Sequence, residues 1–457
     1  MARPSGYPAS SKKSGSNRRL KKLLVEYLLV ASLLLEPENA RIHSDKQVLQ
    51  IARSIETFGF ISPVLVDANL HVIAGHGRLL ACKLLGQKSV PVIRLEHLSE
   101  HQRRALMITD NRLTENSEWD TRLLGEQLKI LSEAEINFNI EVTGFEMGEI
   151  DLFIENLNPS AEEDPADVLP EPSAVRVSRL GDIWQLGKHH VLCGDALSRS
   201  CYKLLMGDYR AHVIFADPPY NVRIDGHVTG NGKIRHREFA MASGEMSDVQ
   251  FTQFLADALN LAASNSQAGS LHYVCMDWRH MGNLLAAGRM SYTEFKNLCV
   301  WVKDNGGMGS FYRSQHELVF VFQNGKTSHR NNVQLGQFGR SRTNVWRYPG
   351  VNSFSRSSSE GNLLALHPTC KPVAMVADAI LDCSARGEIV LDPFLGSGTT
   401  VIAAERTGRR CCGIELDPVY VDTIVRRWQA FTGQSAVHGI SGRKFAELEE
   451  EAASGHE

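Results

Sequence analysis

Short apolar runs alternate with helix-patterned segments along most of the 457-residue chain. In the first hundred residues this pattern predicts a small α+β domain, with strands at 24–30, 63–66, 71–74 and 90–93 and helices at 48–58 and 75–85. Charged helical sequence continues beyond residue 100, and we expect it to extend the domain to 19–157. The residues before it, 1–18, predict a disordered basic tail.

A stretch rich in proline and acids at 158–176 has the composition of a linker and predicts a domain boundary. The second domain is expected at 177–433, and a charged C-terminal tail at 434–457. Apolar runs in the second domain predict strands at 211–215, 271–276, 298–302, 318–322, 388–391 and 411–414. Helical or loop segments separate these runs, which is typical of a largely parallel α/β sheet.

Composition excludes several classes of protein. The net charge of -3 gives no global sign of a nucleic-acid partner, so any such site must be a local patch. The nine cysteines include no C-x-x-C pair, which argues against a disulfide framework and a zinc site and favours a reducing cytoplasm. The apolar run 23–35 contains Glu26 and is too short to span a bilayer. The acids and histidines of the first domain are scattered, and we expect no metal site there.

The run 211–215 delivers an acid, two prolines and an aromatic residue to its carboxyl end, as Asp217, Pro218, Pro219 and Tyr220. In open α/β sheets this edge binds ligands. The carboxylate and the Pro218 carbonyl can accept hydrogen bonds from an amine, Pro219 stiffens the turn, and the Tyr220 ring can stack on a flat heterocycle. These residues predict a clamp for an exocyclic amine. The alternative is a stiff turn with Asp217 as a cap.

A second chemical centre follows the predicted strand 388–391. The glycine-rich turn 392–400 leads into a helix, but it lacks the lysine of a P-loop and the G-x-G-x-x-G pattern. It therefore suits a nucleoside-bearing ligand without a phosphate chain, whose carboxylate would lie at the turn. Glu415 ends the next strand about twenty residues later, where an acid is expected to bind ribose hydroxyls.

Residues 323–359 form a local basic segment, with six Lys or Arg, no Asp or Glu, and interleaved aromatic residues. Such groups can neutralise phosphates, and some can reach base edges. A flexible polar loop is the alternative. The predicted DNA contacts are Lys326, Arg330, Arg340, Arg342 and Arg347.

The order of these features resembles the β-class amino-methyltransferases of DNA, in which the catalytic half precedes the cofactor half. The resemblance covers more than half of the chain. It implies a Rossmann-like domain in permuted motif order that uses S-adenosylmethionine (SAM). Asp217-Pro218-Pro219-Tyr220 corresponds to the catalytic motif IV. The cofactor residues implied are Asp195, Ala196, Lys371, Pro372, Asp392, Phe394, Gly396, Ser397, Gly398, Thr399, Glu415 and Asp417, with Lys371 and Pro372 in the motif X loop 367–372.

The resemblance also implies methyl transfer to an amino nitrogen of a base flipped out of double-stranded DNA. Asp as the first clamp residue resembles the N6-adenine enzymes, whereas Ser is commoner in N4-cytosine enzymes. We therefore expect an adenine-specific enzyme, with N4-cytosine methylation as the alternative. A homodimer and a restriction partner are left open.

The first domain resembles the ParB/Srx-like N-terminal domain through Pro37–Arg41, Phe58-Gly59-Phe60, Pro63–Val66 and the turn Gly75-His76-Gly77-Arg78. A basic turn at a helix N-terminus can hold a phosphate or nucleotide. The turn departs from the G-x-R-R pattern of nucleotide-binding members at Gly77, which puts nucleotide hydrolysis in doubt. A rival interpretation makes the chain a ParB-like DNA-binding or partition protein with a non-catalytic second domain.

Overall fold

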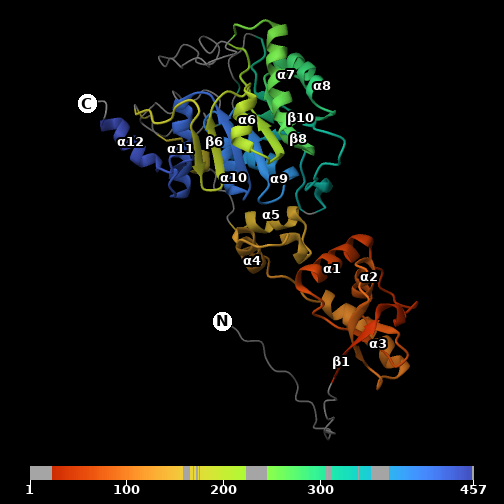
Figure 1. Cartoon of the computed structure of the whole chain (residues 1–457). Coiled ribbons are helices and arrows are strands. Elements are labelled where there is room, and N and C mark those ends of the chain that lie inside the picture. The colour runs from red at the N-terminus through yellow and green to blue at the C-terminus, as the bar shows by residue number, and fades with distance from the viewer. Residues whose placement is uncertain are drawn as a thin grey trace, which may run out of the picture. The chain divides into compact units, whose positions relative to one another are not determined.

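The computed structural model describes residues 23–157, 165–167, 169–170, 173, 175–222, 244–304, 306, 311–337, 339–350 and 370–454. The chain divides into two compact units: 1–119 with 137–144, and 120–136 with 145–457 (Figure 1). The predicted basic tail, most of the predicted linker and residues 367–369 of the motif X loop lie outside the described residues. In the described part, no helix is long and apolar enough to cross a membrane.

The first unit is built on a four-stranded sheet in the order β1-β4-β2-β3. Ser44 begins its first helix by accepting a hydrogen bond from the Gln47 N–H, and Ile55 lies in the apolar core between helix and sheet. The predicted strands and helices are confirmed with small shifts in their ends. The elements are β1 (Val25–Leu29), α1 (Asp45–Phe58), β2 (Val64–Val66), β3 (Val72–Ala74), α2 (His76–Leu84), β4 (Ser89–Arg94), α3 (Glu100–Glu115) and the 3-10 turn Ile140–Thr143.

The second unit contains a ten-stranded sheet in the order β11-β9-β10-β8-β7-β12-β13-β6-β5-β14. Its five central strands, β8, β7, β12, β13 and β6, are parallel, and antiparallel strands extend the sheet on both sides. The strands are β5 (Ile183–Leu186), β6 (His189–Cys193), β7 (Ala211–Ala216), β8 (Ser266–Met276), β9 (Glu294–Val302), β10 (His316–Gln323), β11 (Val345–Arg347), β12 (Ile389–Asp392), β13 (Arg410–Glu415) and β14 (Val437–His438).

Helices cover both faces of this sheet (Figure 1). Successive side chains of a strand point to opposite faces, so Val213 and Phe215 join one core while Ile214 and Ala216 join the other. The first core includes α9 (Val373–Cys383), α10 (Thr399–Arg406) and α11 (Pro418–Thr432). The second includes α6 (Arg199–Met206), α7 (Asp248–Ser264) and α8 (Met281–Ser291). The α/β Rossmann-like fold predicted from the sequence is confirmed.

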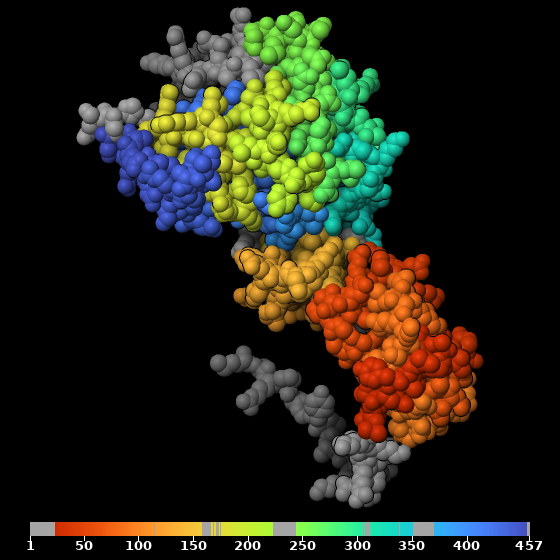
Figure 2. All heavy atoms as spheres, viewed as in Figure 1, coloured from red at the N-terminus to blue at the C-terminus, as the bar shows by residue number. Residues whose placement is uncertain are grey.

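The end of the first unit differs from the sequence-based expectation. The helices α4 (Thr121–Glu133) and α5 (Met147–Glu155) belong to the second unit. Helix α5 packs on α9, and the buried Asp151 of α5 pairs with Arg409 (2.7 Å, Oδ2 to Nη2). In Figure 2 the orange residues of these helices border the blue residues of that unit. Between these two helices, the 3-10 turn Ile140–Thr143 belongs to the first unit.

The predicted linker and C-terminal tail also contain packed residues. Ala166 is buried and its carbonyl accepts a hydrogen bond from Arg427 (2.9 Å), while the Asp167 carboxylate accepts one from the Val373 N–H (2.8 Å). Phe445 of α12 (Phe445–Ser454) is fully buried against Trp184. The many charged residues of these two segments made them look unpacked in the sequence, although Ala166 and Phe445 are buried.

Candidate active site

Four neighbouring strands end at the same edge of the large sheet. The parallel order β7-β12-β13-β6 brings the residues that follow or close these strands side by side: Asp217, Asp392, Glu415 and Asp195. The carbonyl of Glu415 accepts a hydrogen bond from the Gly194 N–H (2.9 Å), which joins the last two strand ends. The amine clamp and the glycine turn, 175 residues apart in the sequence, therefore adjoin one another. We call this edge the clamp edge.

Two side chains of the chain itself engage the Asp217 carboxylate. The Tyr220 hydroxyl donates to Oδ1 (2.7 Å), and the Lys371 ammonium donates to Oδ2 (2.5 Å). Lys371 is only 4% exposed and lies 5.5 Å from the centre of the Tyr220 ring. Between Asp217 and Tyr220, Pro218 is buried and Pro219 half-buried. These contacts hold Asp217 and Tyr220 together and place the Lys371 ammonium on the Asp217 carboxylate.

Two further charged residues complete this network, and the sequence analysis missed both. Glu317, at the start of β10, lies 3.2 Å (Oε2) from the Lys371 ammonium and 3.2 Å from the Tyr220 hydroxyl. Its other oxygen pairs with Lys303, which follows β9. An acid opening an apolar strand was visible in the sequence. Its position at the clamp edge was not, because β10 runs antiparallel to β8.

Burial and pairing set the charge states in this network. Burial raises the pKa of Asp217, and Lys371 opposes that shift. Burial also acts to raise the pKa of Glu317, but Lys371 and Lys303 outweigh it and lower the value to about 2. The pKa of Lys371 is raised, because Asp217 and Glu317 outweigh the effect of its burial. The lysine is therefore an ammonium at neutral pH and cannot act as a base.

The glycine turn has the backbone geometry that a close ligand requires. Gly396 and Gly398 have positive φ angles (53° and 82°), and Gly398 caps the N-terminus of α10. A Cβ atom on Gly413 would lie 2.3 Å from Leu395, so only glycine lets the turn pack on β13. Asp392 accepts hydrogen bonds from the Thr400 hydroxyl (2.6 Å) and the Phe394 N–H (2.9 Å).

Glu415 faces this turn and is held by the backbone. Its carboxylate accepts hydrogen bonds from the N–H groups of Gly396 (2.8 Å) and Asp417 (2.9 Å). Burial raises the pKa of Glu415 to about 7 and that of Asp392 also to about 7. Each carboxylate oxygen has two lone pairs, so Glu415 keeps acceptor capacity for ligand hydroxyls.

The remaining predicted cofactor residues lie around the same turn. Ser397 and Thr399 are buried, and the Arg427 guanidinium contacts both hydroxyls at 3.3 Å. The Lys371 carbonyl accepts a hydrogen bond from the Thr399 hydroxyl (3.3 Å), although the ammonium of Lys371 goes to the clamp. The others have local roles. Pro372 precedes α9 and Asp417 caps α11. Asp195 accepts a hydrogen bond from the Leu197 N–H, Ala196 is buried, and the Phe394 ring centre lies 6.3 Å from that of Phe254.

Strand direction divides the predicted DNA contacts between two edges of the sheet. β10 begins at the clamp edge, so Lys326, beyond its end, lies at the opposite edge. Arg330 also lies there, 4.0 Å from Glu388 at the start of β12. Arg347 pairs with Val302, at the end of β9, and is exposed at the clamp edge. Of these three, Arg347 alone shares an edge with Asp217.

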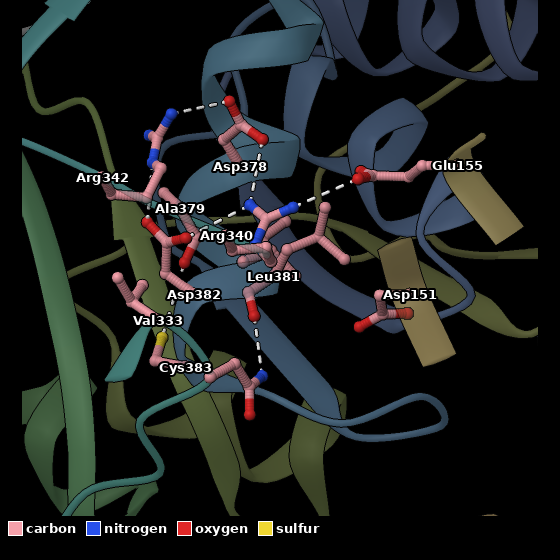
Figure 3. A network of polar contacts seen from close by, with 12 residues as sticks. Asp151, Glu155, Val333, Arg340, Arg342, Asp378, Ala379, Leu381, Asp382 and Cys383 are labelled. Atoms are coloured by element: carbon pink, nitrogen blue, oxygen red, sulfur yellow. Dashed lines mark hydrogen bonds and ion pairs between the residues drawn. The ribbon is translucent and has the colours of Figure 1, made fainter. Parts of the chain in front are cut away.

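Arg340 and Arg342 are held in a partly buried ionic network (Figure 3). Arg340 is 6% exposed and pairs with Asp378 (3.1 Å), Asp382 (3.2 Å) and Glu155 (3.1 Å). Arg342 pairs with Asp378 (2.8 Å) and Asp382 (3.2 Å) and donates to the Tyr348 hydroxyl (2.7 Å). Carboxylates of α5 and α9 bind these guanidinium groups within the chain, and contact of the two arginines with DNA stays a prediction.

Comparison with known proteins shows which families the two domains of the chain match. Residues 211–426 match the N6/N4 family described as DNA methylase, 122–180 match the ParB-methyltransferase HTH domain, and 13–112 match the ParB N-terminal domain. The chain is a ParB-type domain fused to an N6/N4 DNA methylase domain. The predicted SAM-dependent methyltransferase domain and ParB-like domain are thereby confirmed. The helix-turn-helix match covers α4 and α5, which the sequence analysis treated as an extension.

Individual relatives match different parts of the fusion. The chain is 27% identical over 242 residues to the Type II methyltransferase M2.MboI of Moraxella bovis, covering 49% of this chain and 83% of that protein. It is 43% identical over 83 residues to the ParB-like nuclease domain-containing protein YnaK of Escherichia coli K12, covering 18% and 95%. Among solved structures, the cytosine-N4-specific PvuII DNA methyltransferase aligns with a TM-score of 0.42 and 15% identity, covering 63% and 97%.

The methylase domain has residues suited to SAM. The positive-φ glycines let a ligand approach the turn, and buried Glu415 offers carboxylate oxygens to hydroxyl groups. No phosphate-binding lysine follows the glycines, which agrees with a cofactor that has no phosphate chain.

The ParB-type domain carries a pocket of its own. Its volume is about 200 Å³, and Arg41, His43, His76 and Arg78 are among its lining residues. Gly75 has a φ of 98° and caps α2, and Arg78 donates to the Ser62 carbonyl (2.8 Å). The Nε2 atom of His76 is buried without a hydrogen-bond partner in the described structure. The predicted basic turn thus lines a cavity.

Proposed function

We propose that the methylase domain transfers a methyl group from SAM to the exocyclic N6 amine of a flipped adenine in double-stranded DNA. The observation that carries this proposal is that the Asp217–Tyr220 turn lies at the same sheet edge as the glycine turn after Asp392 and the Glu415 carboxylate. Asp at the first clamp position supports adenine. N4-cytosine is the second candidate, because the amine of cytosine offers the same two N–H donors.

The clamp residues would activate the amine of the base by accepting its hydrogen bonds and holding it in place. The lone pair of an amino group on a base ring is delocalised, which makes the nitrogen a poor nucleophile. Hydrogen bonds from its two N–H groups to Asp217 and the Pro218 carbonyl favour a pyramidal nitrogen with an available lone pair. Bound SAM supplies an activated methyl group. Holding the amine in line with that methyl group can contribute about 7–11 kcal/mol to the lowering of the barrier.

DNA would approach the clamp edge. The β9–β10 connection at this edge exposes Phe311 (84%) and Tyr312 (83%), and Arg347 of β11 lies beside the end of β9. Aromatic side chains can stack on unpaired bases or wedge between base steps, and arginine neutralises phosphate. These residues support an approach of DNA from the edge that also contains Asp217.

The test measures transfer of tritium from labelled SAM to plasmid DNA from a methylation-deficient host. We expect Asp217→Ala to lower the rate by at least about 100-fold, because a positioned hydrogen-bonding group contributes 10²–10³ in rate. The Kd for SAM should stay within about twofold. Asp257→Ala, an exposed acid of α7, is the matched control and should keep full activity.

Mass spectrometry of the nucleosides then identifies the base. N6-methyldeoxyadenosine supports the proposal, whereas N4-methyldeoxycytidine replaces adenine by cytosine. Undiminished transfer by Asp217→Ala would refute the assigned role of the clamp.

We also propose that the pocket of the ParB-type domain binds a phosphate-bearing ligand. Arg41 and Arg78 supply positive charge, and the N-terminus of α2 supplies N–H groups at Gly75–Arg78. Calorimetry with nucleoside triphosphates should detect binding that Arg41→Ala weakens. The exposed Arg122→Ala variant is the control, and equal loss in both variants would contradict this site.

A further inference from the structure

The amine clamp is closed by an amine that belongs to the protein. Both Asp217 oxygens are engaged, one by the Tyr220 hydroxyl and the other by the Lys371 ammonium at 2.5 Å. The ammonium, a nitrogen donor, occupies an acceptor that the proposed function gives to the base amine. Each Asp217 oxygen keeps a second lone pair, but a base amine that enters the clamp must share the carboxylate with a charged donor, which weakens the hydrogen bond that the amine can make.

Glu317 offers this ammonium a second carboxylate. The Lys371 nitrogen lies 2.5 Å from Asp217 Oδ2 and 3.2 Å from Glu317 Oε2, so it already contacts both acids. Glu317 is 8% exposed, and Lys303 holds its other oxygen. The low pKa of Glu317, about 2, keeps it an anion at every physiological pH. Glu317 is thus a permanent counter-ion for Lys371.

We propose that Glu317 is a positioning residue of the clamp, which takes over the Lys371 ammonium when a base amine binds and so releases Asp217 for that amine. This inference rests on the proposed methyl transfer. The main chain of Lys371 is fixed between the Thr399 hydroxyl and the start of α9, whereas its side chain has a flexible four-carbon stem. A small movement of the nitrogen completes the exchange without moving the backbone.

The central test is Glu317→Gln, which keeps the shape of the side chain and removes its charge. Lys371 then has Asp217 as its only carboxylate partner in the network, and the base amine is excluded more strongly. Because a hydrogen bond to a charged group corresponds to about a 10- to 100-fold effect, we expect the single-turnover methylation rate to fall by that factor. SAM binding should be unchanged, which controls for folding. Glu317→Asp keeps the carboxylate and should restore most of the rate.

A double-mutant cycle separates this role from a structural one. Lys371→Met removes the competing ammonium, so adding Glu317→Gln to it should change the rate by less than about threefold. An equal loss from Glu317→Gln in both backgrounds, or a Glu317→Gln variant with wild-type activity, would overturn the proposal.

One measurement does not depend on catalysis. The side-chain nitrogen resonance of Lys371 in labelled protein can be assigned by its absence from Lys371→Met. Its chemical shift should change in Glu317→Gln, because the ammonium loses one of its two carboxylate partners, whereas Asp257→Ala should leave it unchanged. An unchanged shift in Glu317→Gln would overturn the inference even if the wild type methylates DNA. A wild type that transfers no methyl group would instead refute the proposed function, while the resonance still decides whether Glu317 holds the ammonium.

Discussion

Two buried ionic networks in the methylase domain use similar groups for different ends. At the clamp, Lys371 and Lys303 meet Asp217, Glu317 and the Tyr220 hydroxyl. In the second network, which we call the arginine network, Arg340 and Arg342 meet Asp378, Asp382, Glu155 and the Tyr348 hydroxyl. Both networks border α9, which begins after Lys371 and Pro372 and carries both aspartates of the arginine network.

The cation explains the difference. Arginine is a planar fork with five fixed donors, and each arginine here bridges at least two carboxylates. Such a network fixes the segment 340–348 and α5 against α9. Lysine carries a compact charge on a flexible stem, so its nitrogen can exchange one carboxylate for another. The guanidinium group of arginine is therefore suited to stabilising the fold, whereas the ammonium group of lysine is suited to a site that a substrate must enter.

The largest expected effect comes from breaking the arginine network. Arg342→Met leaves the half-buried Asp378 and Asp382 with one arginine fewer, and we expect the free energy of unfolding to fall by about 3 kcal/mol. Urea unfolding of the full chain, followed by tryptophan fluorescence, measures the change. Lys371→Met is the matched variant in the clamp. It should cost less stability, because Lys303 still pairs with Glu317 and burial, which raises the pKa of Asp217, lets that carboxylate take up a proton. An equal or greater loss in Lys371→Met would contradict the distinction between support and substrate site.

A smaller effect is expected from protonating Glu415, whose carboxylate is held by backbone N–H groups instead of a cation. With a pKa of about 7, this group becomes neutral as pH falls and so loses the charge of the carboxylate that we propose as the acceptor for ribose hydroxyls. The Kd for SAM should therefore rise by about tenfold between pH 8 and pH 6. Calorimetry at both pH values measures it. In Glu415→Gln the binding should be weaker and its pH dependence flatter, and an unchanged slope would contradict the assignment to Glu415.

The smallest effect concerns the phosphate contact that we propose for Arg347, which lies outside both networks. Arg347→Ala should lower the slope of log K against log salt for DNA binding by about 1, because one counterion fewer is released. Lys326→Ala, at the opposite edge, should leave the slope unchanged. Fluorescence anisotropy with a DNA duplex at several salt concentrations measures both. Equal changes in the two variants would contradict an approach of DNA from the clamp edge.

The sequence by itself determined the contiguous features of this protein. The apolar runs and their flanking turns gave the strands and helices, since local pattern and turn chemistry act over a few residues. The Asp217–Tyr220 turn, the glycine turn and Glu415 could be identified for the same reason. Their order along the chain was enough to indicate a methyltransferase domain, and the family match confirmed it.

Only the tertiary structure decided which charged groups meet. Arg340 looked like a DNA contact because its acidic partners lie on α5 and α9, at least 38 residues away along the chain. Glu317 went unnoticed because the direction of β10 within the sheet decides whether its first residue lies beside Asp217 or at the opposite edge. The sequence specifies charges and turns locally, but strand order and direction, set by packing over the whole domain, decide whether a charge supports the fold or faces the substrate.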